Sequence, residues 1–211
     1  MVGRTKSRGW SDRLAMGALG SCRSAGRRWP GSDCCGRASR IASLVRPSIW
    51  LGSRGGTNTI EFLVGRNKLE RISTDDLGPA TAVLVQRATK RLETAKGALA
   101  AEDFDGAFTN AYDVYRMAGE ALLLVQGLRA TGGDGSHVTV EDAVCAQFGG
   151  VVEDFNKAIY ECFRQGRHAA QYFDPSKAEK TRPDAGWALS TADRALSRST
   201  ALIDGGTVEP Y

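Results

Sequence analysis

The chain has 211 residues and a net charge of +4, but the charge is divided unevenly along it. Residues 1–60 contain 11 Lys and Arg and only two acidic residues, which gives +9 and leaves −5 for the remainder. A mildly acidic folded part excludes a protein that coats nucleic acid over its whole surface. No apolar run approaches the roughly 18 residues that a membrane span requires, so we expect no membrane association.

The five cysteines indicate a reducing compartment. Cys22, Cys34 and Cys35 lie in the irregular N-terminal region, whereas Cys145 and Cys162 fall on expected helix faces. An odd count without framework spacing is not typical of a secreted disulfide scaffold. The two histidines provide too few partners for a zinc site built on these thiols. We therefore expect a cytoplasmic protein with no cofactor, in which Cys145 and Cys162 are small core residues.

Residues 1–61 are rich in Arg, Ser and Gly, and no helical or strand period persists in them. Three interpretations stay open. In the first, the segment is an upstream extension and the natural protein begins near Val64. In the second it is a basic arm, and in the third it is an Arg- and Ser-rich targeting sequence. Its composition predicts disorder in each case. The expected organisation is a disordered basic extension over 1–61, a helical bundle over 62–206 and a short tail over 207–211.

Two amphipathic helices open the expected bundle. In residues 77–100 the apolar positions repeat at steps of three and four, and Pro79 fits the first turn, whose N–H groups lack helical partners. The second helix, over residues 104–125, has a stripe of aromatic and small residues: Phe104, Phe108, Ala111, Tyr115, Ala118, Leu122 and Val125. Its alanines allow a neighbouring helix to approach closely, so the pair is expected to form an antiparallel hairpin.

A glycine-rich loop over residues 131–136 separates this pair from a third helix. His137 is expected at the end of the loop, with Thr139 capping a continuous helix over residues 140–163. Gly149 and Gly150 then lie inside that helix and are expected to bend it, at a cost of roughly 1 kcal/mol each relative to alanine. Pro183 begins a fourth helix, which Gly205 and Gly206 end.

The sequence therefore predicts an all-α fold. Long helices joined by short loops, with no alternating strand pattern, are typical of an antiparallel up-and-down bundle, here of four to five helices. About 130 residues suffice to bury one core. A single helical hairpin resembling a tetratricopeptide unit has no second copy downstream, so a repeat array is not expected.

The end of the third helix carries the candidate functional residues. Arg164 and His168, and His168 and Tyr172, are spaced four apart, while Arg167 follows Arg164 by three, so one helix edge would present them together. Arginine binds phosphate through paired N–H groups and stabilises charge in phosphoryl transfer, and histidine exchanges protons near neutral pH. The alternative is structural: an Arg–Glu network and a packed tyrosine. His137 is a further binding candidate. The alternative is that it is a solvent-exposed histidine in the loop without a binding role.

The folded part resembles the HEPN superfamily of small helical proteins. The resemblance spans about residues 77–203 and is carried by AYDVYRMAGEALL in the second helix, FRQGRHAAQYFDP in the third and DAGWALSTADRAL in the fourth. It implies catalytic roles for Arg167, His168 and Tyr172. It also implies a homodimer, an RNA or nucleotide ligand, a nucleotidyltransferase or antitoxin partner, and a role in toxin–antitoxin, defence or stress systems.

The chain departs from the pattern of active HEPN ribonucleases. In those enzymes a histidine follows the arginine after a short spacer, but counting from Arg167 that position holds Tyr172. A phenol with a pKa of about 10 is a poor general base at neutral pH. His168 stands instead at the polar position beside the arginine. The resemblance therefore implies either a non-catalytic member or one with altered chemistry.

Three functions of different classes follow. The first is an HEPN-like domain that binds RNA or a nucleotide at Arg164, Arg167, His168 and Tyr172, with weak or no nuclease activity. The second is an active metal-independent endoribonuclease in which His168 or His137 is the base. The third is a structural or protein-interaction bundle.

Overall fold

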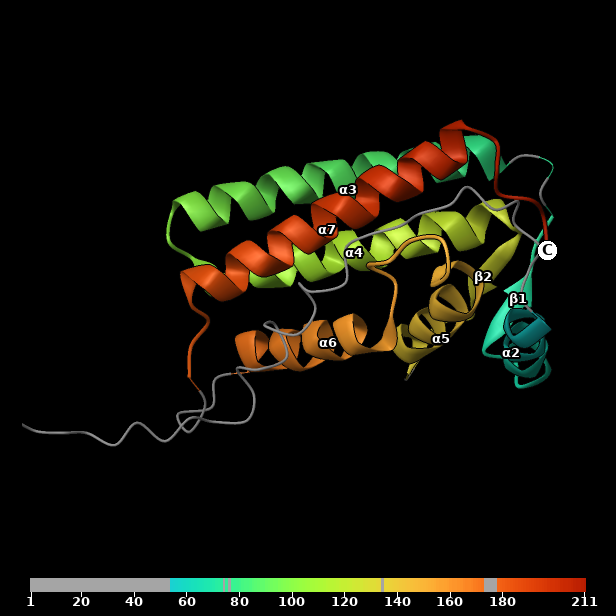
Figure 1. Cartoon of the computed structure of the whole chain (residues 1–211), viewed down its shortest axis with the longest axis horizontal. Helices are drawn as coiled ribbons and strands as arrows, with labels where there is room; N and C mark the ends of the chain where they lie inside the picture. The colour runs from blue at the N-terminus through green and yellow to red at the C-terminus, as the bar shows by residue number, and fades with distance from the viewer. Residues whose placement is uncertain (1–53, 74, 76, 134, 173–177) are drawn as a thin grey trace, which may run out of the picture. The chain divides into compact units, whose positions relative to one another are not determined.

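The computed structural model describes residues 54–73, 75, 77–133, 135–172 and 178–211 (Figure 1). All of them belong to the second of the two units into which the chain divides, Gly31–Tyr211. This unit is all-α, as predicted: its described part contains six helices and a two-stranded sheet. The extension expected to be disordered lies outside the described residues as far as residue 53.

The central element is helix α4, Phe104–Val125, which has 11 buried residues along its length. It follows α3, Leu77–Ala100, through a short turn, and the Asp103 side chain caps it by accepting a hydrogen bond from the Gly106 N–H at 2.8 Å. Helix α7, Arg182–Asp204, packs against both, and consecutive long helices alternate in direction (Figure 1). The predicted antiparallel hairpin and up-and-down order are therefore present.

Helix α7 begins as its sequence indicates. Thr181 and Asp184 form a reciprocal capping box, and Pro183 lies in the first turn. The buried stripe of α7 consists mostly of alanine, including Ala188, Ala192 and Ala195, with no exposed surface at these positions. Small side chains on this stripe let α7 approach α4 closely.

The expectation of one continuous third helix over residues 140–163 is wrong. The segment forms two helices, α5 over Ser136–Phe148 and α6 over Lys157–Gln171. A Cβ atom at Gly149 would lie 2.6 Å from the Cys145 carbonyl oxygen and 2.9 Å from that of Phe155, so the chain turns back sharply there. Asn156 then starts α6, because its side chain accepts a hydrogen bond from the Ile159 N–H.

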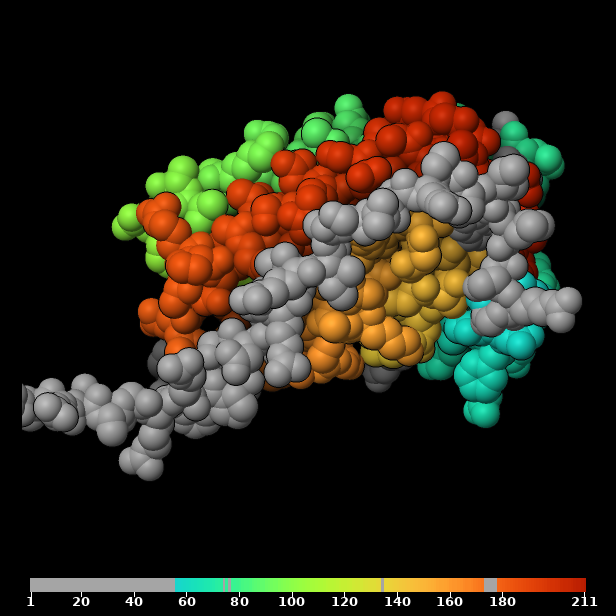
Figure 2. Space-filling model, viewed as in Figure 1, coloured from blue at the N-terminus to red at the C-terminus, as the bar shows by residue number. Residues whose placement is uncertain are grey.

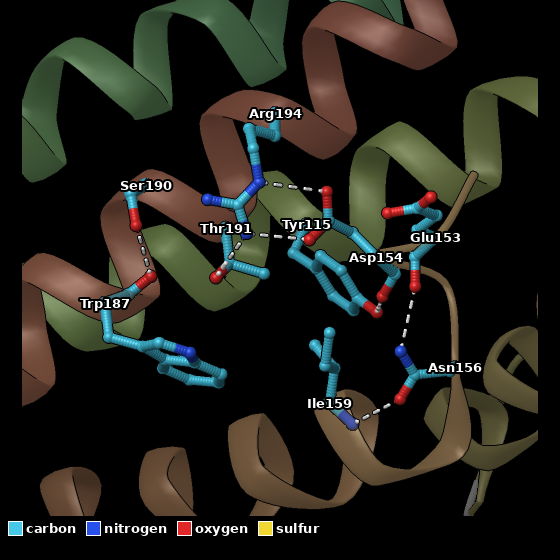
Figure 3. A network of polar contacts seen from close by, with 9 residues as sticks. All are labelled: Tyr115, Glu153, Asp154, Asn156, Ile159, Trp187, Ser190, Thr191 and Arg194. Carbon is cyan, nitrogen blue, oxygen red and sulfur yellow. Dashed lines mark hydrogen bonds and ion pairs between the residues drawn. The ribbon is translucent and has the colours of Figure 1, made fainter. Parts of the chain in front are cut away.

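The linker between α5 and α6 is held by contacts from distant helices (Figure 3). Arg194 of α7 donates to both carboxylate oxygens of Asp154, at 2.8 and 3.2 Å. The Tyr115 hydroxyl of α4 donates to the Asp154 carbonyl oxygen at 2.5 Å. A bidentate arginine–carboxylate pair and a hydrogen bond from a buried tyrosine offset the helical hydrogen bonds that the segment gives up.

Helix α2, Arg54–Gly65, crosses the boundary expected at residue 62. Its Ile60 is fully buried in the common core, so the folded part includes residues assigned to the extension. It forms a projection at one end of the described unit (Figure 2). Strands β1, Leu69–Arg71, and β2, Leu128–Ala130, pair antiparallel with Leu69 opposite Ala130, and neither was predicted.

Residues 207–211 pack on the fold and do not form a free tail. The Tyr211 N–H donates to the Gln126 carbonyl oxygen at 2.9 Å, and its hydroxyl lies 3.2 Å from a carboxylate oxygen of Glu61 in α2. The Arg71 guanidinium of β1 lies 5.6 Å from the centre of the Tyr211 ring. Tyr211 therefore joins α2, β1 and the end of α4.

Candidate functional site

The four residues expected along one edge of α6 make different contacts in the structure. Arg164 is exposed and forms an ion pair with Glu161, one turn earlier in the same helix. His168 and Tyr172 are exposed too, with ring centres 4.8 Å apart at the end of the helix. Arg167 is half-buried and turns toward α4. Arg167 faces Tyr112, whereas His168 and Tyr172 contact each other, so the structure does not bring all four side chains into one cluster.

Arg167 faces Tyr112 of α4. Its guanidinium carbon lies 5.2 Å from the centre of the Tyr112 ring, a cation–π distance. Its Nε atom is buried and has no hydrogen-bond partner in the described part of the chain. Tyr112 itself is only 3 % exposed, and its ring also packs against Phe163 of α6. Core packing therefore fixes the ring on which Arg167 rests.

His137 reaches the same tyrosine from α5. It was expected in a loop, but α5 begins at Ser136, with Gly135 in the left-handed conformation at the N-cap, so His137 lies in the first turn. Its Nδ1 atom is 3.3 Å from the Tyr112 hydroxyl oxygen, and the two ring centres are 6.1 Å apart. Which of the two groups donates depends on the imidazole tautomer.

Arg116 adds a second cation on α4. It follows Tyr112 by four residues, and so lies on the same face one turn later. It forms an ion pair with Glu120, and its Nε atom is buried without a hydrogen-bond partner among the described residues. We call Tyr112, Arg116, His137 and Arg167 the Tyr112 cluster. It brings together side chains from three consecutive helices, α4, α5 and α6.

The surroundings keep His137 neutral. Burial lowers its pKa below the ordinary value, and the positive charges of Arg116 and Arg167 lower it further, while Asp113 opposes them. Burial raises the pKa of the Tyr112 hydroxyl, against the effect of the same two arginines. At neutral pH the cluster therefore holds two guanidinium cations, a neutral imidazole and a protonated phenol.

Two nearby carboxyl groups are also affected by burial. Burial raises the pKa of Glu120 above its ordinary value although the ion pair with Arg116 opposes the change. Burial raises the pKa of Glu141 in α5 as well, with Arg164 opposing it. Both shifts reduce the cost of protonating these carboxyl groups when a second anion approaches, because protonation removes the repulsion between like charges.

This arrangement suits a phosphate group. Guanidinium groups bind phosphate oxygens through charge-assisted hydrogen bonds, and a protonated phenol supplies a further donor. A neutral imidazole can accept a proton from a hydroxyl group, as a general base does. Arg116 and His137 both retain partial exposure, so a ligand from solvent can reach their polar ends.

Sequence reasoning named Arg167 and His137 but missed Tyr112 and Arg116. Tyr112 lies next to the expected inward stripe of α4, four residues after Phe108, and that spacing was a signal for its burial. Arg116 follows by the same step and is a charged residue on a mostly apolar helix, which marks it as functional or paired. The contact with His137 could not be predicted, because it depends on where α5 begins and how it packs.

Within the described residues, no group of three or more His, Cys, Asp or Glu side chains is placed to hold a metal ion. None of the helices in that part of the chain combines the length and apolarity that crossing a membrane requires. Comparison of the chain with protein-family models, with curated proteins and with solved structures finds no match.

Proposed function

We propose that the chain is an HEPN-like helical domain that binds the phosphate groups of RNA or of a nucleotide at the Tyr112 cluster. The observation that carries this proposal is the meeting of Arg167 from α6 and His137 from α5 on one buried Tyr112 ring. Two helices thereby supply a cation and an imidazole to one place, which is the combination that phosphate recognition and proton transfer use.

The charge balance of the cluster supports an anionic ligand. Arg116 and Arg167 contribute two positive charges, and burial raises the pKa of Glu120, the carboxyl that pairs with Arg116. The Nε atoms of both guanidinium groups are buried, so these groups lie partly in surroundings of low dielectric constant. Their attraction to a phosphate is stronger there than in water. Arg164 also pairs with a glutamate, but its side chain is more exposed than that of Arg116, so solvent and salt screen its attraction to a phosphate more strongly.

The HEPN resemblance supports the same ligand class and extends the proposal. It adds a toxin–antitoxin, defence or stress role, a homodimer, and a nucleotidyltransferase or antitoxin as partner. These parts of the proposal rest on the motif similarity in the second, third and fourth expected helices. The phosphate site rests on the geometry of the Tyr112 cluster and stands separately from them.

A second candidate function, metal-independent cleavage of RNA, is favoured by the state of His137. Its lowered pKa leaves the imidazole neutral, so it can take the proton of a ribose 2′-hydroxyl. If Nδ1–H donates to the Tyr112 oxygen, Nε2 is the atom that accepts this proton. Arg116 and Arg167 would then stabilise the charge that develops on the phosphate. His137 is therefore a better base candidate than the exposed His168.

Replacing Arg167 with alanine is expected to weaken binding of a short single-stranded RNA by about 10- to 100-fold, since a charge-assisted hydrogen bond to phosphate is worth roughly 1.5–3 kcal/mol. Arg198→Ala, at an exposed arginine of α7, is the control and should change affinity by less than about twofold. Both variants retain the basic residues 1–60, so any RNA binding by that segment is common to them. Isothermal titration calorimetry on the full chain measures both affinities, and equal losses would contradict the proposed site.

A further inference from the structure

A cavity of about 530 Å³ lies at the end of the bundle where α3 begins and α7 ends. Its wall comes from the first turns of α3, the last turn of α7 and the end of α4. Figure 2 shows the surfaces of α3 (green) and α7 (red) side by side in this part of the molecule. The cavity shares no residue with the Tyr112 cluster, so it is a separate feature of the fold.

The wall is mainly apolar. Leu77 and Val85 of α3, Val125 of α4 and Ile203 of α7 line the cavity, and each is only partly buried by the rest of the chain. Branched side chains that face a water-filled cavity leave apolar surface in contact with solvent, and covering that surface is favourable by about 25 cal/mol per Å². The volume falls within the roughly 300–1,000 Å³ typical of small-molecule sites.

The charges around the cavity do not favour an anion. Asp204 is the only charged side chain among the described residues that line it. The positive end of the α3 dipole, at Leu77, meets the negative ends of the α4 and α7 dipoles, at Val125 and Asp204, so the helix ends add no net attraction for an anion. This differs from the Tyr112 cluster, where two arginines favour an anion. An uncharged ligand avoids the repulsion that the Asp204 carboxylate would exert on an anion.

From these features we propose that the cavity between α3, α4 and α7 is a binding site for an uncharged, largely apolar small molecule of the size of a fused-ring aromatic compound. The ligand lies between the first turns of α3 and the last turn of α7. By covering the partly buried Leu77, Val85, Val125 and Ile203 it joins the two helix ends. The site is independent of the phosphate site, and either can be lost without the other.

The test uses N-phenyl-naphthylamine, an uncharged dye whose emission increases in apolar surroundings, and the full chain. Saturable binding is expected, and Ala82→Phe should weaken it by about tenfold or more, because Ala82 is an exposed residue of the cavity wall and the added ring fills the space. Val83→Phe places the same ring on the next residue of α3, which is 47 % exposed and does not line the cavity, and should change affinity by less than about twofold.

Two further comparisons complete the test. Val85→Trp fills the cavity from a second position and should weaken binding as Ala82→Phe does. Anilinonaphthalene sulfonate has the ring skeleton of the first dye with a negative charge added, and should bind about tenfold more weakly to this cavity. The proposal is overturned if the parent chain shows no saturable binding of the uncharged dye, or if both cavity-filling variants bind it like the parent. It is also overturned if the charged dye binds as tightly as the uncharged dye and the same substitutions weaken its binding.

Discussion

Replacing Gly166 with alanine is expected to lower the free energy of unfolding by about 2–3 kcal/mol, the upper part of the range for overpacking a core. Gly166 lies in α6 against the buried ring of Phe108 from α4. A Cβ atom there would lie 2.3 Å from the Phe108 Cζ atom and 2.4 Å from Cε1, well inside contact distance. The substitution therefore requires α6 or the ring to move.

The Phe108 ring has little room to yield. Its centre lies 5.7 Å from that of Phe163 and 6.4 Å from that of Trp187, so rings from α6 and α7 flank it. The Lys180 ammonium nitrogen lies 4.8 Å from the ring centre. Displacing the ring would disturb the contacts of α4 with both helices, which is why the steric cost exceeds the gain of about 1 kcal/mol from replacing a helical glycine by alanine.

Gly97 provides the matched control. It also lies inside a helix, α3, but a Cβ atom there would meet nothing within 4 Å. Gly97→Ala should therefore raise the free energy of unfolding by up to about 1 kcal/mol. Urea denaturation followed by circular dichroism measures both variants, and the same sign of change in the two would contradict the close packing of α6 on Phe108.

The second large effect concerns catalysis at the Tyr112 cluster. Under the ribonuclease function proposed above, His137→Ala is expected to reduce metal-independent cleavage of RNA by about 100-fold or more, because a general base contributes roughly 10²–10⁴-fold. The rate should be measured by gel assay on the full chain with a chelator present. The expected loss follows from removal of the only neutral imidazole beside the two arginines among the described residues.

His168→Ala is the control for this experiment. His168 is exposed at the end of α6 and contacts Tyr172, away from Tyr112. Its replacement should leave the cleavage rate within about twofold of the parent. A loss confined to His168→Ala would move the base to the end of α6 and contradict the assignment. A parent chain that binds RNA without cleaving it would remove the ribonuclease function and leave the binding function in place.

The long helices could be predicted because each carries its own apolar stripe. The stripes of α3, α4 and α7 are local patterns of three- and four-residue steps, and Pro183 and the Thr181 capping box mark one boundary directly. The break between α5 and α6 could not be placed in the same way. It depends on Arg194, forty residues beyond Asp154, and two glycines alone are compatible with a bent helix.

Short elements were missed for a different reason. Strands β1 and β2 have three residues each, too few to show an alternating period, and they pair across a sequence separation of about sixty residues. Helix α2 lies in a glycine-containing segment next to the basic extension, and only its contacts with the core identify Ile60 as buried. The formation of these elements therefore depends on tertiary contacts and not on the local propensity of their residues.

For the candidate site, the sequence identified residue types but not their directions. Helical spacing placed His168 beside Tyr172, and their rings are indeed in contact. Spacing also suggested that Arg167 would join them, but α6 packs with Arg167 toward Tyr112. How a helix is rotated about its own axis depends on the surfaces it packs against. For that reason Arg167 and His137, which lie in different helices, both contact Tyr112.

The titration of His137 by nuclear magnetic resonance tests the central claim most directly, and it is simple to follow because the chain contains only two histidines. In the free chain its pKa should lie below 6.5, since burial, Arg116 and Arg167 disfavour the imidazolium and only Asp113 favours it. A short RNA bound at the cluster should raise this pKa, because its phosphates favour the charged form. Affinity should then increase as the pH falls from the bound-state pKa to the free-state pKa. An unshifted pKa that saturating RNA leaves unchanged would contradict a phosphate site at Tyr112.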